Sequence, residues 1–178
     1  MKRNILFPIV TIALSAAILL GASLALSGIA IENGKREHIQ IMQTLLPGSE
    51  NFTVEPYTGD DANIISVHKA ENGFVIETVT RGYVDDIRML IGVSNDGKVT
   101  GLVVRELDET FGLGAAALTD TDFLSQFLNT SGEAEVGSTV DALTGATVTS
   151  KAITRAVNSA VAYVTGADAS SGATSWGG

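Results

Sequence analysis

The stretch ENGFVIETVTRGYVDDIRMLIGVSNDGKVTGLVVRE, residues 71–106, alternates β-branched runs with turn signals. Glu71-Asn72-Gly73 and Asn95-Asp96-Gly97 each separate two such runs, which is typical of β-hairpins. Strands joined by hairpins form an antiparallel sheet, and we expect this sheet to bury one face only. The strands predicted from the pattern are Phe52–Tyr57, Asn63–Ala70, Phe74–Tyr83, Ile87–Ser94 and Lys98–Glu106.

Helical periodicity flanks these strands on both sides. Residues 32–46 predict a short helix that Pro47-Gly48 ends, and Thr149–Thr165 predicts the clearest helix of the chain, capped by Gly166. Thr119–Asn129 predicts a further helix with Asp120 and Asp122 in its first turn and a buried stripe of Leu118, Phe123, Phe127 and Leu128. The predicted fold class is α+β, a small domain with an antiparallel sheet and flanking helices.

The N-terminus carries a long apolar run without a single charged residue from Asn4 to Ile31. A helix of that length exceeds the roughly 30 Å hydrocarbon core of a bilayer, so we expect a single membrane span. Lys2 and Arg3 precede the run and predict a cytoplasmic N-terminus, with the rest of the chain on the outer side of the cytoplasmic membrane. A cleaved signal peptide is the alternative, but its apolar region is usually only about 7–15 residues long.

Composition excludes several classes of function. The chain has 178 residues, with 20 acidic and 11 basic side chains and a formal charge of −9, which argues against nucleic acid as a partner. It has no cysteine, so disulfides, thiolate metal sites and cysteine nucleophiles are excluded. Its two histidines, His38 and His68, are far apart in sequence, and we expect neither a catalytic triad nor a metal site.

Two loop segments have a composition that is typical of ligand-binding loops. In LDETFGLG, residues 107–114, two glycines flank Leu113 and let the backbone approach a ligand closely, although a plain loop has the same composition. In DALTGATVTS, residues 141–150, four hydroxyl side chains and a glycine precede the last long helix. Unpartnered N–H groups at a helix N-terminus favour an anion there. Capping by Thr149 or Ser150 explains only one of the four hydroxyls.

These residues resemble a known family. The pattern Asp-x-x-Thr-Gly-Ala-Thr at 141–147 is similar to the flavinylation motif of bacterial FMN-binding domains, and Glu109–Gly114 resembles the segment of that family that lies by the flavin. With the apolar N-terminus, Arg81-Gly82-Tyr83 and the turn at Asn95–Lys98, residues 1–166 resemble the G subunit of Rnf-type ion-translocating electron-transfer complexes. That family is related to the C subunit of the sodium-pumping NADH:quinone reductase.

The resemblance implies a function and a site. It implies FMN attached by a flavin transferase through a phosphoester to Thr147, and electron relay within a ferredoxin:NAD oxidoreductase complex coupled to Na⁺ or H⁺ translocation. The protein would not be catalytic alone, and its partners would be the other membrane and peripheral subunits. The implied cofactor-binding residues are Thr147, Asp141, Leu143, Thr144, Gly145, Ala146, Val148, Thr149, Ser150, Glu109, Thr110, Gly112, Leu113 and Gly114.

Two features depart from the family pattern. Phe111 stands where the family usually has proline, and the tail repeats the attachment pattern at residues 168–174, ending at Thr174. We favour Thr147 because a helix N-terminus, which binds phosphate well, follows it and no helix is predicted after Thr174.

The predicted organisation is a cytoplasmic start and span at 1–31, a juxtamembrane helix at 32–48, an FMN-binding domain at 49–166 and a mobile tail at 167–178. Three other interpretations stay open at this point: an anchored module that binds a free anion, a structural assembly subunit, and an FMN domain of a different membrane reductase.

Overall fold

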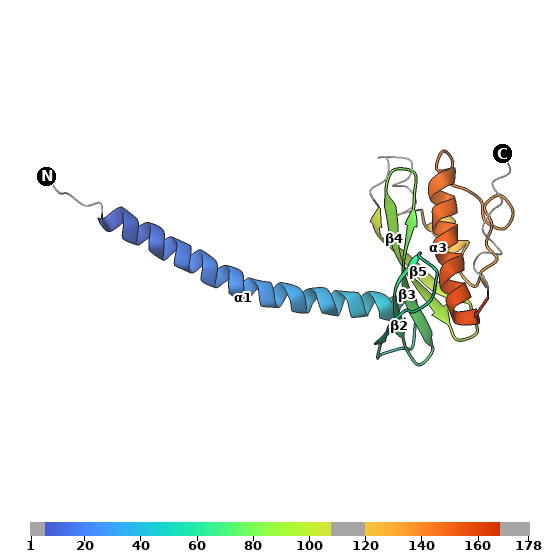
Figure 1. The fold of residues 1–178 in the computed structure, drawn as a ribbon, viewed down its shortest axis with the longest axis horizontal. Coiled ribbons are helices and arrows are strands. Elements are labelled where there is room, and N and C mark those ends of the chain that lie inside the picture. The colour runs from blue at the N-terminus through green and yellow to red at the C-terminus, as the bar shows by residue number, and fades with distance from the viewer. Residues whose placement is uncertain (1–5, 108–119, 168–178) are drawn as a thin grey trace. The chain divides into compact units, whose positions relative to one another are not determined.

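The computed structural model describes residues 6–107 and 120–167. The chain divides into two compact units, residues 1–40 and 41–178. The elements in chain order are α1 (Leu6–Leu45), β1 (Thr53–Glu55), β2 (Ile64–Lys69), β3 (Gly73–Arg81), β4 (Asp86–Ser94), β5 (Val99–Leu107), α2 (Thr121–Ser125) and α3 (Thr147–Thr165). Figure 1 labels most of them.

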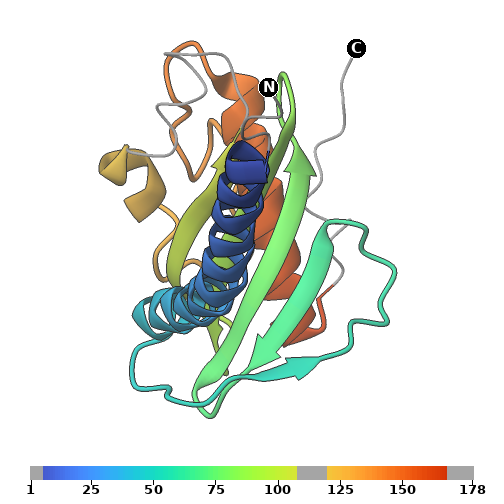
Figure 2. The same cartoon turned by 90° about the vertical axis from the view of Figure 1, so that its left-hand side faces the viewer.

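The sheet confirms the five predicted strands. Its strands lie edge to edge in chain order, β1-β2-β3-β4-β5, and every neighbouring pair is antiparallel (Figure 2). Both predicted hairpin turns are present. Ala70 N–H donates to the Gly73 carbonyl at 2.8 Å, and Gly97, whose φ of 78° favours glycine, donates to the Ser94 carbonyl at 2.9 Å.

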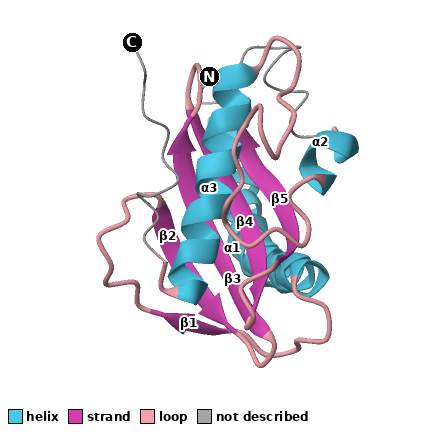
Figure 3. Ribbon diagram, turned by 90° about the vertical axis from the view of Figure 1, so that its right-hand side faces the viewer, coloured by secondary structure: helices cyan, strands magenta, loops and turns pink. Residues whose placement is uncertain are grey.

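One face of the sheet packs against α3 (Figure 3). The apolar face of α3 has Ile153 and Val157 fully buried against Ile76 and Ile91 of the central strands. Full burial of a side chain of this size stabilises the fold by about 1.5–3 kcal/mol. The largest core cluster of the domain therefore lies between α3 and the sheet.

The prediction that the sheet buries only one face is wrong. Val75 and Leu90, which point to the opposite face, are also buried, and they pack against Met42, Leu45 and Leu46. The end of α1 and the residue after it therefore cover the second face of the sheet, which the strand pattern of the sequence does not predict.

The N-terminal helix is continuous over 40 residues and ends at Leu45, just before the predicted stop at Pro47-Gly48. The predicted membrane span is not confirmed: among the residues described, no helix combines the length and the apolarity that crossing a bilayer requires.

The helix predicted at Thr119–Asn129 is much shorter than expected. α2 covers only Thr121–Ser125, where the Asp120 carboxylate caps it by accepting from Phe123 N–H at 2.9 Å, and turns follow as far as Asn129. Phe123 and Phe127 are buried as predicted, but Leu128 is 41% exposed because the helix has already ended. Leu118 lies outside the described residues.

The last helix begins two residues earlier than predicted. α3 starts at Thr147 after Ala146 as N-cap, so neither Thr149 nor Ser150 caps it. Its predicted C-cap is confirmed, because Gly166 has φ 69° and donates to the Ala162 carbonyl at 2.9 Å. The predicted tail from residue 168 onward lies outside the described residues.

Candidate functional site

α3 begins at the end of the sheet where β3 finishes. The Thr80 hydroxyl, near the end of β3, donates to the Ala152 carbonyl of α3 at 3.0 Å. At the opposite end, the rings of Phe74 and Tyr163 lie 5.8 Å apart edge to face. The helix therefore runs antiparallel to β3, and it begins at the end of the sheet that holds the β3–β4 turn (Figure 1).

β5 finishes at this same end of the sheet. Leu107, its last residue, is opposite Ile87, which follows directly after the first residue of β4. The topology thus brings together the exit of β5, the β3–β4 turn and the start of α3. The predicted ring-side residues Glu109, Thr110, Gly112, Leu113 and Gly114, with Phe111, lie outside the described residues.

The loop before α3 is held by its own hydrogen bonds. Ala146 N–H donates to the Leu143 carbonyl at 2.9 Å, closing a turn in which Gly145 has φ 77°. The buried Ser150 hydroxyl accepts from Leu143 N–H at 3.1 Å and donates to the Ala146 carbonyl at 3.0 Å. Gly145 is thus required by backbone conformation, since an L residue is strained there.

Gln126 holds the first residue of the motif. Its side-chain oxygen accepts from Asp141 N–H at 2.7 Å, and its side-chain nitrogen donates to the Asp141 carbonyl at 3.4 Å. This pairing fixes the backbone at Asp141 and leaves that residue exposed. Gln126 was not predicted from the sequence, because its partner is 15 residues away and no local pattern signals such a contact.

The N-terminus of α3 has the features of an anion site. Ala146 makes no side-chain capping bond, and the first turn carries no acidic residue. The N–H groups of Thr147, Val148 and Thr149 therefore have no intrahelical partner, and they form the positive end of the helix dipole. The Ala146 and Ser150 N–H groups are already bonded, to the Leu143 and Ala146 carbonyls, and are unavailable to a ligand.

Exposure divides the motif into two groups. Thr149 and Ser150 are buried, at 1% and 0%, so their hydroxyls do not face outward as expected from the sequence for a phosphate site. Leu143 is half-buried and Ala146 is buried. The exposed members are Asp141, Thr144, Gly145, Thr147 and Val148.

The β3–β4 turn adds an exposed apolar surface. Tyr83 is 71% and Val84 46% exposed. The Arg81 guanidinium holds this turn by donating to the Val84 carbonyl at 2.7 Å and pairing with both Asp85 and Asp86 at 3.3 Å.

α3 is tied to the same turn. Arg155 donates to the Arg81 carbonyl at 3.2 Å, and Val148, in the first turn of the helix, is 43% exposed. The arrangement suits a ligand with an anionic end, to meet the helix N-terminus, and an apolar planar body, to lie toward Tyr83 and Val84.

Another polar cluster, Ser66, His68 and Glu77, does not form a hydrolytic site. Ser66 Oγ donates to Glu77 at 2.9 Å and lies 3.3 Å from His68 Nε2, so the serine bridges the other two. A triad needs the histidine between the serine and the acid. Within the described part of the chain, no group of three or more acidic, histidine or cysteine side chains could hold a metal.

Comparison with known proteins defines the family. Residues 82–162, from the β3–β4 turn through most of α3, match the FMN-binding domain family. The chain is 35% identical over 141 residues to the G subunit of the ion-translocating oxidoreductase complex of Methanosarcina acetivorans, covering 70% of this chain and 73% of that protein. The chain belongs to this G-subunit family. The match confirms the family expected from the two motifs.

Other members of the G-subunit family match over shorter ranges. The G subunit of the Na(+)-translocating ferredoxin:NAD(+) oxidoreductase complex of Acetobacterium woodii is 35% identical over 98 residues, covering 50% of this chain and 47% of that protein. The proton-translocating counterpart of Clostridium ljungdahlii is 38% identical over 99 residues, with 52% and 53% covered. The chain thus spans about half the length of these two relatives.

Proposed function

We propose that this chain is a membrane-anchored flavoprotein subunit that relays electrons within an ion-translocating ferredoxin:NAD oxidoreductase complex, with FMN covalently attached to Thr147. The observation that carries the proposal is an exposed threonine at the first position of an uncapped helix, inside a domain of the FMN-binding family. Relatives named as subunits of such complexes support the assignment to one.

The residues around Thr147 fit a phosphate ester. The Thr147 side-chain oxygen carries the phosphorus, and the N–H groups of Thr147, Val148 and Thr149 stabilise the phosphate oxygens with the helix dipole. Thr144 and Gly145 are exposed beside them and complete the phosphate surroundings. Ser150 acts through the loop that it holds, because its hydroxyl is already bonded to Leu143 and Ala146.

Attachment requires an activated donor. The bond from Thr147 Oγ to the FMN phosphorus forms as a phosphoanhydride bond of a flavin dinucleotide breaks, the nucleoside monophosphate leaves, and the hydroxyl proton passes to a base of the flavin transferase. The product is a phosphodiester with a single negative charge. Asp141 is exposed with its backbone fixed by Gln126, which suits a residue that the transferase reads or that orients the loop.

The protein positions the cofactor and leaves the redox chemistry to it. When bound, FMN accepts electrons in pairs and releases them singly. Tyr83 and Val84 provide apolar surface for the ring system on a turn to which the Arg81 guanidinium is hydrogen-bonded. By resemblance to the family, Glu109, Thr110 and Leu113 border the ring system, and Gly112 and Gly114 belong to the same cofactor-binding segment.

Membrane anchoring is the part of the proposal that rests on sequence. The 28 residues from Asn4 to Ile31 carry no charge, and Lys2 and Arg3 precede them. A span over this run with a cytoplasmic N-terminus puts the FMN domain outside the cytoplasm. A covalent link then retains a cofactor that could not readily be replaced there. The coupled ion is Na⁺ or H⁺, because this chain is similar both to a subunit of a complex named for Na⁺ translocation and to one named for proton translocation.

The test is in-gel flavin fluorescence of the denatured full-length chain after co-expression with a bacterial flavin transferase. We expect Thr147→Ala to abolish the fluorescent band and Thr174→Ala, at the end of the repeated pattern, to leave it unchanged. A normal band in Thr147→Ala, or a colourless wild type with a transferase proven active on another substrate, contradicts the proposal.

A further inference from the structure

The charges of α3 differ from those of the chain as a whole. The chain has a formal charge of −9, yet α3 contains no acidic residue and only two charged ones, Lys151 and Arg155. They follow Thr147 by four and by eight residues. Residues spaced by four lie on one stripe of a helix, so the two cations share the stripe of Thr147.

Side-chain direction brings Lys151 toward Thr147. In an α-helix the Cα–Cβ bonds tilt toward the N-terminus, so the lysine stem extends back over the turn that begins at Thr147. The Cβ atoms of such a pair lie about 5–6 Å apart, within reach of a lysine. An anion four residues before a lysine is also the more stabilising order of the two.

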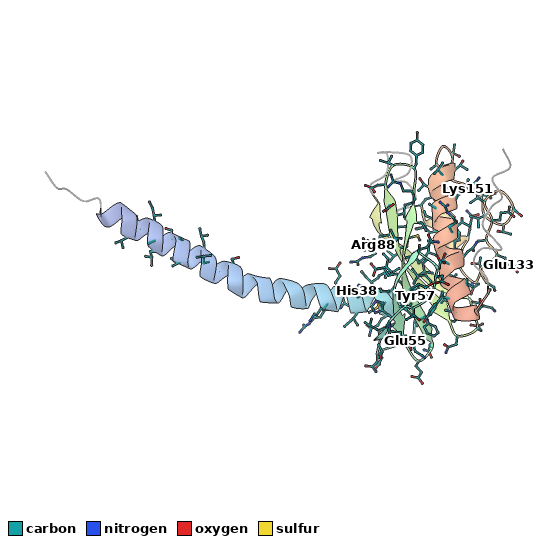
Figure 4. The ribbon with its side chains drawn as sticks, viewed as in Figure 1. His38, Glu55, Tyr57, Arg88, Glu133 and Lys151 are labelled. Atoms are coloured by element: carbon teal, nitrogen blue, oxygen red, sulfur yellow. The ribbon has the colours of Figure 1, made fainter. Side chains whose placement is uncertain are left out.

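The other cation of the stripe, Arg155, lies about two helical turns from Thr147. Arg155 donates to the Arg81 carbonyl at 3.2 Å, which commits its guanidinium to the β3–β4 turn. Lys151 is exposed and lies on α3 toward its first turn, as Figure 4 shows. Lys151 follows Thr147 by four residues and Arg155 by eight, so of the two cations Lys151 lies about one helical turn from Thr147.

We infer that Lys151 is a positioning residue that pairs with the phosphodiester on Thr147 and fixes the direction in which the flavin leaves the helix. This inference rests on the proposed attachment at Thr147. Pairing with a permanent anion adds to the helix dipole and restrains a linkage that would otherwise rotate about several single bonds.

The experiment compares Lys151→Gln with Lys98→Gln, each with and without flavin. Lys98 is a matched control because it is also exposed and loses the same charge, but it lies at the other end of α3, where an added Cβ on its neighbour Gly97 would meet Thr165. Full-length proteins are made without the transferase, or loaded to completion as verified by intact mass. The unfolding midpoint and the ³¹P resonance of the phosphodiester are then measured.

We expect loading to raise the midpoint of the wild type and of Lys98→Gln by the same amount, and that of Lys151→Gln by about 1–4 °C less. The deficit should shrink in about 1 M salt, because the pair is solvent-exposed. The ³¹P resonance should shift in Lys151→Gln and stay in place in Lys98→Gln. An equal gain in all three loaded proteins overturns the role of Lys151 alone, whereas a wild type that never acquires flavin overturns the attachment itself.

Discussion

The hydroxyl of Thr100 on β5 donates a hydrogen bond to the carbonyl oxygen of Leu45, the last residue of α1, at 2.5 Å. The final carbonyls of a helix lack intrahelical partners, and this bond satisfies one of them. Leu45 reaches this position because Gly92 and Gly101, paired across β4 and β5, have no side chains. The second face of the sheet is thus shaped to receive residues 41–46.

This close approach predicts a graded loss of stability. A Cβ at Gly92 would lie 2.3 Å from the Leu45 carbonyl oxygen, whereas the nearest contact of a Cβ at Gly101 would be 3.1 Å. We expect Gly92→Ala to lower the free energy of unfolding by about 1–3 kcal/mol and the midpoint by about 2–8 °C, with a smaller effect for Gly101→Ala.

Differential scanning calorimetry of the full-length chain in detergent measures both changes. Gly34→Ala is the control, since an added Cβ there meets nothing within 4 Å and favours helix. A loss at Gly34 equal to that at Gly92 would show that the close approach is unimportant.

Two glycine substitutions should show that the turn before α3 affects flavin loading separately from stability. Gly145→Ala forces an L residue to a φ of 77°, which costs about 1–2 kcal/mol and displaces Thr144 and Ala146. Gly137→Ala imposes the same strain at a φ of 87° with open space around it. We expect similar losses of stability from both but reduced flavin loading only in Gly145→Ala, as in-gel fluorescence would measure. Equal loading in the two variants would argue against the turn as part of the site.

Removing the Ser150 hydroxyl should lower the stability of the domain, because this hydroxyl holds the loop before α3. Ser150→Ala leaves the partly buried Leu143 N–H without its side-chain partner, which costs about 0.5–1.5 kcal/mol. Ser125→Ala removes an exposed hydroxyl that donates to the Asp122 carbonyl at 2.9 Å, and we expect little change. Urea unfolding of both variants measures the difference, and the expectation fails if Ser150→Ala is as stable as Ser125→Ala.

We expect the folded domain to lose stability in alkali because of Tyr163. Burial, together with the negative charge of Glu55, raises the pKa of the Tyr163 phenol above its ordinary value. The unfolded chain then loses this proton at lower pH than the folded domain, so stability declines as pH rises from about 10 through the raised pKa. Tyr163→Phe should reduce that decline and Tyr83→Phe, at an exposed position, should not. Identical alkaline unfolding curves for wild type and Tyr163→Phe would contradict this.

Local patterns predicted the strands well because each signal lies within a few residues. The Asn-Asp-Gly and Glu-Asn-Gly turns fix their hairpins through neighbouring hydrogen bonds, and β-branched runs between them favour strands. The proposed attachment motif is also visible locally, since Asp141–Thr147 are consecutive.

Long-range contacts account for what was missed. Nothing near Leu45 in the sequence indicates that Gly92 and Gly101 leave space for it, so the cover on the second face was not predicted. Gln126 holds Asp141 from 15 residues away. The start of α3 was placed too late because a hydroxyl cap was expected, whereas Ala146 occupies that position without a capping bond.

The most direct measurement is the intact mass of the denatured full-length chain after co-expression with a flavin transferase, followed by mapping of tryptic peptides. Cleavage after Lys151 and Arg155 puts Thr147 and Thr174 in different peptides. We expect an added mass of one FMN less one water, carried by the peptide that ends at Lys151. An unmodified mass, or flavin on the C-terminal peptide that contains Thr174, would contradict it.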